Sequence, residues 1–334
     1  MPIPKPLSGL IGNPQLMPTV LSTLRINPEH HPRGQPHLSA ASGLVRLGKR
    51  LFVVADDELH LGIFDDFTEA SPMTGEGNLL RLLDGKLPNT MEKRKEAKPD
   101  LETLALLPPL PGFETGALLA LGSGSKPQRQ TGVLIALDEL GTPSGSMATM
   151  DLTALYAPLR SEFADLNIEG AFLSHDHSEF ILLQRGNKTD ARSACIRYDW
   201  RALAAWLVGH HTAPPAAKSV QIITLGSVDG VPLSFTDGAA LPNNQPGNHS
   251  GAWVFSAVAE ATNDSVQDGA CVASAVGIIS QEGKVLSIAL LHNAPKIEGI
   301  AVKAAGKDWL LTMVTDPDNP ELAAQVLQVL LKVV

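Results

Sequence analysis

Hydrophobic residues fall into short runs along the chain, and polar or turn-forming residues separate these runs at regular intervals. Residues 219–226, 284–291 and 309–315 are typical, because each is rich in Val, Ile and Leu and is flanked by Gly, Pro, Asn or Asp. Such runs are typical of β-strands joined by tight turns. The pattern therefore predicts many short strands rather than a few long helices.

The runs also repeat along the chain, and each repeat begins with a short anchor. The clearest anchors are Ile168-Glu169-Gly170 and Ile297-Glu298-Gly299. Alignment on these two copies gives five anchor positions, separated by 60, 67, 68 and 61 residues: Ser42, Glu102, Glu169, Asp237 and Glu298. These units are longer than the roughly 40–50 residues of WD40 or kelch repeats, so the period indicates neither of those families.

Each unit predicts four strands, and the two chain ends predict how the array closes. Residues 19–26 resemble the fourth strand of a unit with no unit before it, whereas the last unit ends after its third strand at residues 323–334. Pairing the two would close a ring, which is the logic of a propeller. We predict an all-β, five-bladed propeller formed by a single domain, 1–334. A pair of β-sandwiches or a mixed α+β fold is the alternative, because residues 200–209 and 320–331 could each form a short helix.

The predicted ring brings the anchors to one place. The first strand of each blade lines the central channel, and its start lies beside the end of the second strand. The anchors should therefore meet the ends of the second strands at one mouth of the channel. The predicted mouth contains, besides the anchors, Asp56, Asp57, Ser123, Gln184, Arg185, Glu260, Thr315 and Asp316.

Several carboxylates gathered at one mouth repel one another and raise each other's pKa. A hard cation such as Ca²⁺ or Mg²⁺ would relieve this repulsion, and so would a cationic or hydroxyl-rich ligand. The alternative interpretation is local, because an acidic residue before glycine can hold a strand-entry turn through its own backbone contacts.

The stretch "SGL…LFVVADD", followed by repeated "(I/L)EG(I/A)" anchors, resembles bacterial propellers of the phytase-like ("esterase-like activity of phytase") group. It is more distantly similar to SdiA-regulated and strictosidine-synthase-like propellers. The resemblance implies a divalent cation at the channel mouth, with calcium the expected ion, and in some members hydrolysis of phosphate or other esters. The implied ligands are Glu102, Glu169, Asp237, Glu298, Asp56 and Asp316. The chain departs from this pattern at Ser42, which replaces an acid, and at Arg185, which adds a positive charge.

Three residues are candidates for contacts with a substrate. Arg185 either neutralises Glu169 in an internal ion pair or clamps an anionic group of the substrate. Lys98 belongs to the basic run 91–100, which is either a lid that attracts anions or a solvated loop or short helix. Ser123 would offer a hydrogen bond to a ligand at the mouth.

Composition narrows the class of protein. The 334 residues are 44% hydrophobic and 18% charged, which is typical of a globular protein. A net charge of −9 argues against a broad nucleic-acid surface, and no apolar run reaches the roughly 18 residues that cross a bilayer. Cys195 and Cys271 match no metal-binding spacing, which favours a reduced, cytoplasmic setting. The expected partner is a small molecule, and no protein partner is indicated.

Together these observations favour a propeller whose mouth binds a divalent cation and a small anionic or ester substrate. Glu169 or Glu298 would then act as general base if the cation leaves it uncoordinated. A non-catalytic binding propeller is the alternative. A third hypothesis is that the acidic residues only shape turns and that function lies elsewhere.

Overall fold

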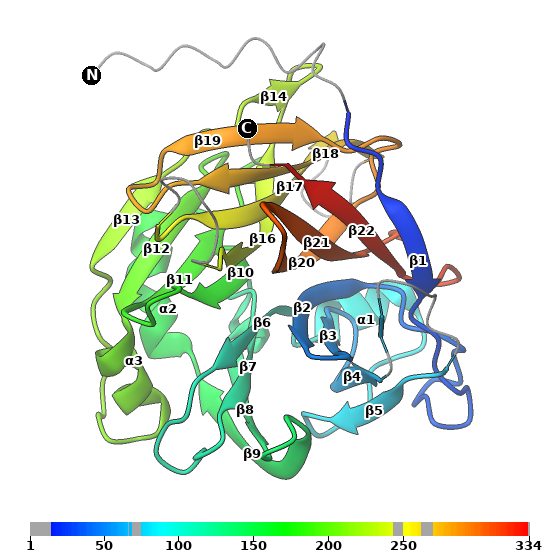
Figure 1. Cartoon of the computed structure of the whole chain (residues 1–334). Helices are drawn as coiled ribbons and strands as arrows, with labels where there is room; N and C mark the ends of the chain where they lie inside the picture. The colour runs from blue at the N-terminus through cyan, green and yellow to red at the C-terminus, as the bar shows by residue number, and fades with distance from the viewer. Residues whose placement is uncertain (1–14, 66, 69–74, 243–249, 262–269, 333–334) are drawn as a thin grey trace.

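Five antiparallel sheets of four strands each surround a common axis (Figure 1). The computed structural model describes residues 15–65, 67–68, 75–242, 250–261 and 270–332. The first four blades follow one another along the chain, and each runs from an inner to an outer strand. The fifth blade takes its outer strand from the start of the described chain. The architecture is therefore the predicted five-bladed propeller.

The blades, numbered I to V in chain order of their inner strands, have the following bounds. Blade I contains β2 (Ala41–Leu47), β3 (Arg50–Ala55), β4 (His60–Phe64) and β5 (Asn78–Arg81). Blade II contains β6 (Leu101–Leu107), β7 (Ala117–Gly122), β8 (Thr131–Leu137) and β9 (Pro143–Asp151). Blade III contains β10 (Ile168–Leu173), β11 (Glu179–Gln184), β12 (Ala194–Asp199) and β13 (Ser219–Ile222). Blade IV contains β16 (Ser234–Ala240), β17 (Trp253–Ala261), β18 (Ala270–Ile279) and β19 (Val285–Leu290). Blade V contains β20 (Ile297–Ala305), β21 (Asp308–Thr315), β22 (Gln325–Leu331) and β1 (Thr19–Thr23).

Helices occupy only short connections between strands. They are α1 (Met91–Ala97), α2 (Thr153–Glu162), α3 (Trp200–Leu207) and the 3₁₀ turn η1 (Pro127–Arg129), and a two-stranded hairpin is formed by β14 (Ser227–Val228) and β15 (Val231–Pro232). Of the two segments that periodicity left open, one is helix α3 and the other contains strand β22. Within the described residues, no helix is long and apolar enough to cross a membrane.

The ring closes as predicted, through the two ends of the chain. Strand β1 pairs antiparallel with β22, with Thr19 opposite Gln328 and Thr23 opposite Gln325. The inner strands β2, β6, β10, β16 and β20 also contact one another in a closed circle. Few sheet edges therefore remain open, which is how a propeller avoids edge-to-edge aggregation.

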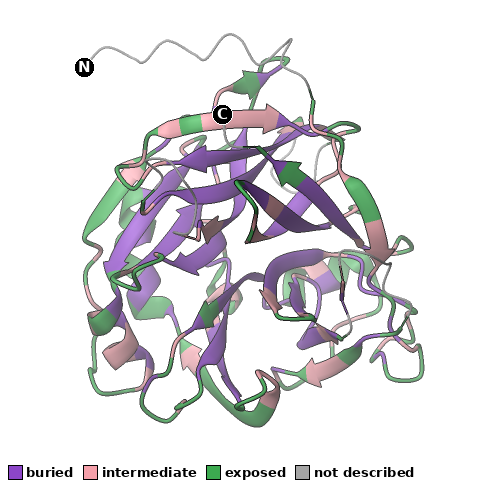
Figure 2. Ribbon diagram, viewed as in Figure 1, coloured by how far each residue is buried: buried purple, intermediate pink, exposed green. Residues whose placement is uncertain are grey.

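The hydrophobic core consists of five clusters, each between two neighbouring blades. In β3, Leu51 and Val53 face blade V, whereas Phe52 and Val54 face blade II, and all four are fully buried. Strands buried on both faces need continuous apolar runs, which explains the runs seen in the sequence. Burial of each such side chain contributes about 1.5–3 kcal/mol. Figure 2 shows this burial along the inner strands, while the outer strands are more exposed.

The anchor glycines let the inner strands approach one another closely. A Cβ atom on Gly43 would lie 2.5 Å from the backbone nitrogen of Leu104, and one on Gly299 would lie 2.5 Å from the carbonyl oxygen of Ser42. Both contacts cross from one blade to the next, so any larger residue would push the ring open. Part of the anchor motif is thus explained by packing at the axis.

Candidate functional site at the channel mouth

The starts of the inner strands and the ends of the second strands meet at one mouth of the channel, as the repeat predicts. Ala41 pairs with Ala55, Leu101 with Gly122, Ile168 with Gln184 and Ile297 with Thr315. The pairing places Asp56, Ser123, Arg185 and Asp316, which directly follow these second strands, beside the anchors of their own blades. Residues far apart in the sequence therefore share one rim.

Three anchor glutamates each lie in a β-bulge. The register shifts between Leu101 and Thr103, between Ile168 and Gly170, and between Ile297 and Gly299, so Glu102, Glu169 and Glu298 are the extra residues. A bulge leaves the extra residue unpaired and re-aims its side chain. This explains how an acidic residue can occur at the same place in three buried inner strands.

Blade IV corrects the predicted alignment by one residue. Its register shifts between Phe235 and Asp237, so Thr236 is the bulged residue and Asp237 takes the place that glycine holds in blades III and V. Asp237 Oδ2 accepts a 2.9 Å hydrogen bond from Ile300 N of the next inner strand, and Oδ1 accepts one from Gly238 N. Asp237 therefore links blades IV and V through backbone groups and does not stand in the ring of glutamates as predicted.

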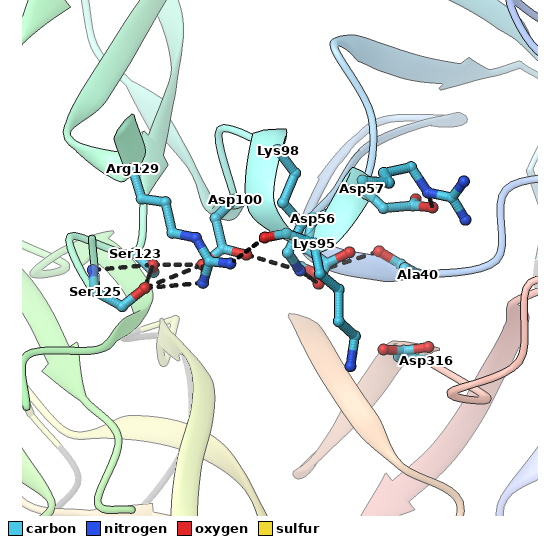
Figure 3. A network of polar contacts seen from close by, with 12 residues as sticks. Ala40, Asp56, Asp57, Lys95, Lys98, Asp100, Ser123, Ser125, Arg129 and Asp316 are labelled. Atoms are coloured by element: carbon cyan, nitrogen blue, oxygen red, sulfur yellow. Dashed lines mark hydrogen bonds and ion pairs between the residues drawn. The ribbon is translucent and has the colours of Figure 1, made fainter. Parts of the chain in front are cut away.

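The side of the mouth formed by blades I and II is organised around Asp100. Lys98 Nζ lies 2.7 Å from Asp100 Oδ1 and also contacts Asp56 Oδ2, while Arg129 Nη1 lies 2.7 Å from Asp100 Oδ2. Ser123 Oγ donates a 2.5 Å hydrogen bond to the same Asp100 oxygen. Figure 3 shows Asp100 between Arg129 and Lys98, with Lys98 reaching it from the end of helix α1. The predicted substrate contacts Lys98 and Ser123 thus both bind a buried aspartate in this structure.

The side formed by blades III, IV and V is organised around Arg185 and Lys296. Arg185 lies 3.4 Å from Glu169, 2.6 Å from Glu260 and 3.6 Å from Glu298. Lys296 Nζ lies 3.1 Å from Glu260 and 3.5 Å from Glu298, and it also pairs with Asp316 at 3.6 Å and Asp318 at 2.5 Å. The expected ion pair between Arg185 and Glu169 is therefore present as one part of a shared network.

Glu102 differs from the other glutamates of the mouth. It is 9% exposed, and within the described residues it accepts no hydrogen bond and has no cation within ion-pair distance. One oxygen each of Asp56, Asp100 and Glu102 lie within 4.8 Å of one another. Among the described residues of the mouth, the carboxylate oxygens that are buried without a hydrogen-bond partner are Asp100 Oδ1, Glu260 Oε1 and Glu298 Oε2. Such oxygens carry a large desolvation cost, which a ligand would relieve.

Burial raises the pKa of several of these carboxyl groups. Burial is the largest cause for Glu102, Glu169 and Glu298, and Glu169 further raises the pKa of Glu102. Burial also raises the pKa of Asp316 to about 7. Burial alone would lower the pKa of Lys98, but Asp56, Asp100 and Glu102 outweigh it and raise that pKa. Burial therefore favours the protonated form of these carboxyl groups, while the raised pKa values of Lys98 and Lys296 keep both lysines charged.

Acidic side chains outnumber basic ones within the described part of this mouth. The acidic groups are Asp56, Asp100, Glu102, Glu169, Glu260, Glu298, Asp316 and Asp318. The basic groups paired with them are Lys98, Arg129, Arg185 and Lys296. These carboxylates outnumber the basic groups named here, and protonation or a bound cation would offset the surplus.

Sequence reasoning missed Asp100, Arg129 and Lys296. Two of them share a signal, because Asp100 and Lys296 each lie two residues before an anchor glutamate. Asn167 has the same position in blade III, where its Nδ2 donates a 2.5 Å hydrogen bond to Glu169. A polar residue two positions before the anchor could thus have been recognised as part of the repeat. Arg129 has no such signal, because it lies in the turn η1 between second and third strands.

Comparison with protein families gives one match. Residues 94–320 match a family described as a family of unknown function, DUF6910. The chain belongs to this family. No curated protein matches the chain.

Two of the solved structures that resemble this chain are distant from it in sequence. One is a luciferin-regenerating enzyme, with 12% sequence identity and a TM-score of 0.42, covering 90% of this chain and 81% of the other. The second is a calcium-binding protein, regucalcin, from Agrobacterium tumefaciens, with 8% identity and a TM-score of 0.44, covering 94% of this chain and 97% of the other. At these values neither likeness indicates a ligand or a reaction for this chain.

Proposed function

We propose that the channel mouth binds a divalent cation, best matched by calcium, through Asp56, Asp100 and Glu102. The supporting observation is the buried Glu102 carboxylate, which has no partner although two further carboxylates lie within 4.8 Å. All three ligands are carboxylates, the donors that hard cations prefer. Calcium is the ion that the resemblance to phytase-like propellers implies.

Lys98 is the competitor for this proposed site. Its ammonium group already lies between Asp56 and Asp100, so an incoming cation has to displace it from at least one of them. A lysine head on a flexible four-carbon stem can move aside without a change in the backbone. We therefore interpret Lys98 as a built-in counter-ion that yields to a divalent cation, which would make binding depend on the exchange of one positive charge for two.

The proposed reaction is hydrolysis of a small ester or phosphoester, as the resemblance to phytase-like propellers implies. A bound divalent cation would polarise a substrate oxygen and lower the pKa of a water molecule. Glu298 suits the role of general base better than Glu169, because its Oε2 has no hydrogen-bond partner and its pKa is raised by burial. Both oxygens of Glu169 are already engaged, by Asn167 and Arg185. Arg185, Ser123 and Lys98 would each have to exchange a carboxylate partner for an anionic group of the substrate.

Calcium-dependent thermal unfolding tests the cation site. In calcium at about 100 times the dissociation constant, the parent should gain about 2.7 kcal/mol, seen as a rise in Tm of several degrees over the value in EDTA. Glu102→Gln should abolish the rise. Asp237→Asn is the matched control, since it changes a buried acid whose oxygens are held by backbone N–H groups, and it should keep the rise. An equal rise in Glu102→Gln, or no rise in the parent with calcium, magnesium or manganese, would contradict the proposed site.

A substrate screen tests the reaction. We expect calcium-dependent turnover of a phosphoester, lactone or aryl ester, and a decrease of roughly 100-fold or more in kcat in Glu298→Gln. Unchanged turnover in Glu298→Gln would remove Glu298 from the role of base. A non-catalytic binding propeller is the second candidate, favoured by the four cations that already pair with carboxylates of the mouth. Calcium binding without turnover of any substrate would support that candidate.

A further inference from the structure

A cavity lies on blade I, away from the charged residues of the channel mouth. It has a volume of about 230 Å³ and is lined by the turn between β3 and β4, the end of β5, the segment that leads to α1, and two residues from the loop before β2. The charged and titratable side chains in its lining are Arg33, Glu58, His60, Arg81 and Lys86. None of these residues belongs to the proposed calcium site.

Two buried nitrogen atoms among the lining side chains lack hydrogen-bond partners. His60 is 7% exposed and its Nδ1 has no partner, the closest acidic atom being Glu58 Oε2 at 3.9 Å. The side chain of Arg33 is 7% exposed and its Nε has no partner. Buried polar atoms without partners are costly, so the Nε–H of Arg33 indicates a missing acceptor and Nδ1 of His60 a missing hydrogen-bond partner.

The lining also carries a surplus of positive charge. Glu58 is the one carboxylate in the described lining, and it is already neutralised by Arg33 at 2.6 Å and bound by His31 at 3.0 Å. Arg81 donates a hydrogen bond to the carbonyl oxygen of Gly85, and within the described part of the chain neither Arg81 nor Lys86 has a carboxylate partner. The whole chain has a net charge of −9, whereas the charged side chains that line this cavity are mostly basic.

Asp57 and Arg94 shield this cavity from the acidic mouth. Asp57 turns away from the mouth and pairs with Arg33 at 3.1 Å and with Arg94 at 2.9 Å. Its negative charge is therefore shared between two guanidinium groups outside the mouth. Arg94 is 4% exposed and belongs to helix α1, whose end also carries Lys98. The basic run 91–100, for which the sequence left a lid or a solvated loop or short helix open, thus contains a short helix tied to Asp57 by the buried Arg94.

We propose that this cavity binds the phosphoryl group of a small molecule. A phosphate dianion offsets the two charges of Arg81 and Lys86 that have no carboxylate partner. The planar guanidinium group of Arg81 matches the oxygens of phosphate, Arg33 offers its unpartnered Nε–H, and His60 supplies a further N–H donor. Burial lowers the pKa of His60, so its imidazole is neutral at pH 7 and donates through one ring nitrogen. This inference does not depend on a cation at the mouth.

The test uses the full chain in EDTA, with inorganic phosphate as the probe and sodium chloride added to constant ionic strength. The His60 side chain is followed by NMR of ¹³C-histidine-labelled protein, with its signal assigned by comparison with His60→Gln. We expect saturable shifts of the His60 signal and a rise in its pKa, because a bound dianion stabilises the imidazolium. We also expect calorimetry to give an affinity at least tenfold higher for phosphate than for succinate, a dianionic dicarboxylate.

Two double variants locate the binding. Arg81→Gln with Lys86→Gln should weaken phosphate binding at least tenfold. Arg201→Gln with Lys307→Gln removes the same two charges from other exposed positions and should leave binding unchanged. Equal weakening in both variants would overturn the proposal, because the effect would then be one of net charge. A His60 signal that phosphate does not perturb would also overturn it, and succinate binding as tight as phosphate would overturn the assignment to a phosphoryl group.

Discussion

The two sides of the channel mouth begin from the same anchor motif but arrange their charges differently. On the side of blades III to V, Arg185 and Lys296 are each shared by several carboxylates that come from different blades. On the side of blades I and II, Lys98 and Arg129 converge on Asp100, and the anchor Glu102 is left without a partner. The first arrangement links three blades through shared cations, whereas the second links blades I and II through Lys98 and leaves Glu102 without a cation within ion-pair distance.

The difference follows from where the cations originate. Arg185 lies at the end of the second strand of blade III and reaches Glu260 on β17 and Glu298 on β20. Lys98 precedes Glu102 by four residues, and its carboxylate partners are Asp56 and Asp100 rather than Glu102. A buried cation shared among blades is costly to remove, because each carboxylate it leaves behind stays buried and uncompensated. A cation with two carboxylate partners leaves fewer of them uncompensated, so it is easier to replace by another cation.

Loss of the shared arginine should have the largest effect. Arg185→Met leaves Glu169, Glu260 and Glu298 with fewer compensating charges, so we expect the free energy of unfolding at pH 8 to fall by about 3–5 kcal/mol. Urea denaturation measures this. Lys218→Met is the control, because Lys218 is exposed and its pair with Glu179 lies at the surface, where solvent screens it. A loss in Arg185→Met no larger than in this control would show that the network does not hold the blades.

Removal of Lys98 should have two opposite effects, one on stability and one on calcium binding. Lys98→Met leaves Asp56 without its ammonium partner, so we expect a loss of roughly 3 kcal/mol of stability in EDTA. In calcium, the same variant should bind the ion at least about tenfold more tightly than the parent, because no ammonium has to be displaced. Urea denaturation and calorimetry measure the two effects. Unchanged or weaker calcium binding would contradict the interpretation of Lys98 as a displaceable counter-ion.

The smallest expected effect is a change in pH dependence on the shared side. Burial raises the pKa of Asp316 to about 7 in the folded protein, against 3.8 in the unfolded chain. Unfolded chains therefore release this proton first as pH rises, and the stabilising contribution of protonated Asp316 is lost between about pH 4 and pH 7. Because its side chain is 16% exposed and screened by solvent, we expect a loss on the order of 2 kcal/mol. Asp316→Asn should remove this part of the pH dependence, as urea denaturation at pH 4 and pH 8 would show. An identical pH profile in the variant would contradict the raised pKa.

Most of the architecture could be predicted from the chain because the propeller repeats one local pattern. Apolar runs of strand length recur with anchors such as Ile168-Glu169-Gly170, and the orphan strand near Thr19 indicates closure with the last blade. The same reasoning misplaced the anchor of blade IV, because Thr236-Asp237-Gly238 also has an acidic residue directly before a glycine. The shift between Phe235 and Asp237 is a matter of hydrogen-bond register, which one residue of sequence cannot reveal.

The pairing of charges at the mouth could not be predicted in the same way. The repeat in the sequence predicts that carboxylates recur near the axis, because hydrophobic runs and turn residues act locally and can be recognised in each strand separately. Which of them finds a cation depends on atoms that approach only when the ring closes: Arg185 meets Glu260 across 75 residues, and Lys98 meets Asp56 across 42. Ion pairs require charged atoms within a few ångströms of each other. The closed ring therefore determines whether an acidic group is compensated, as Glu169 is by Arg185, or has no cation within ion-pair distance, as Glu102 has none among the described residues.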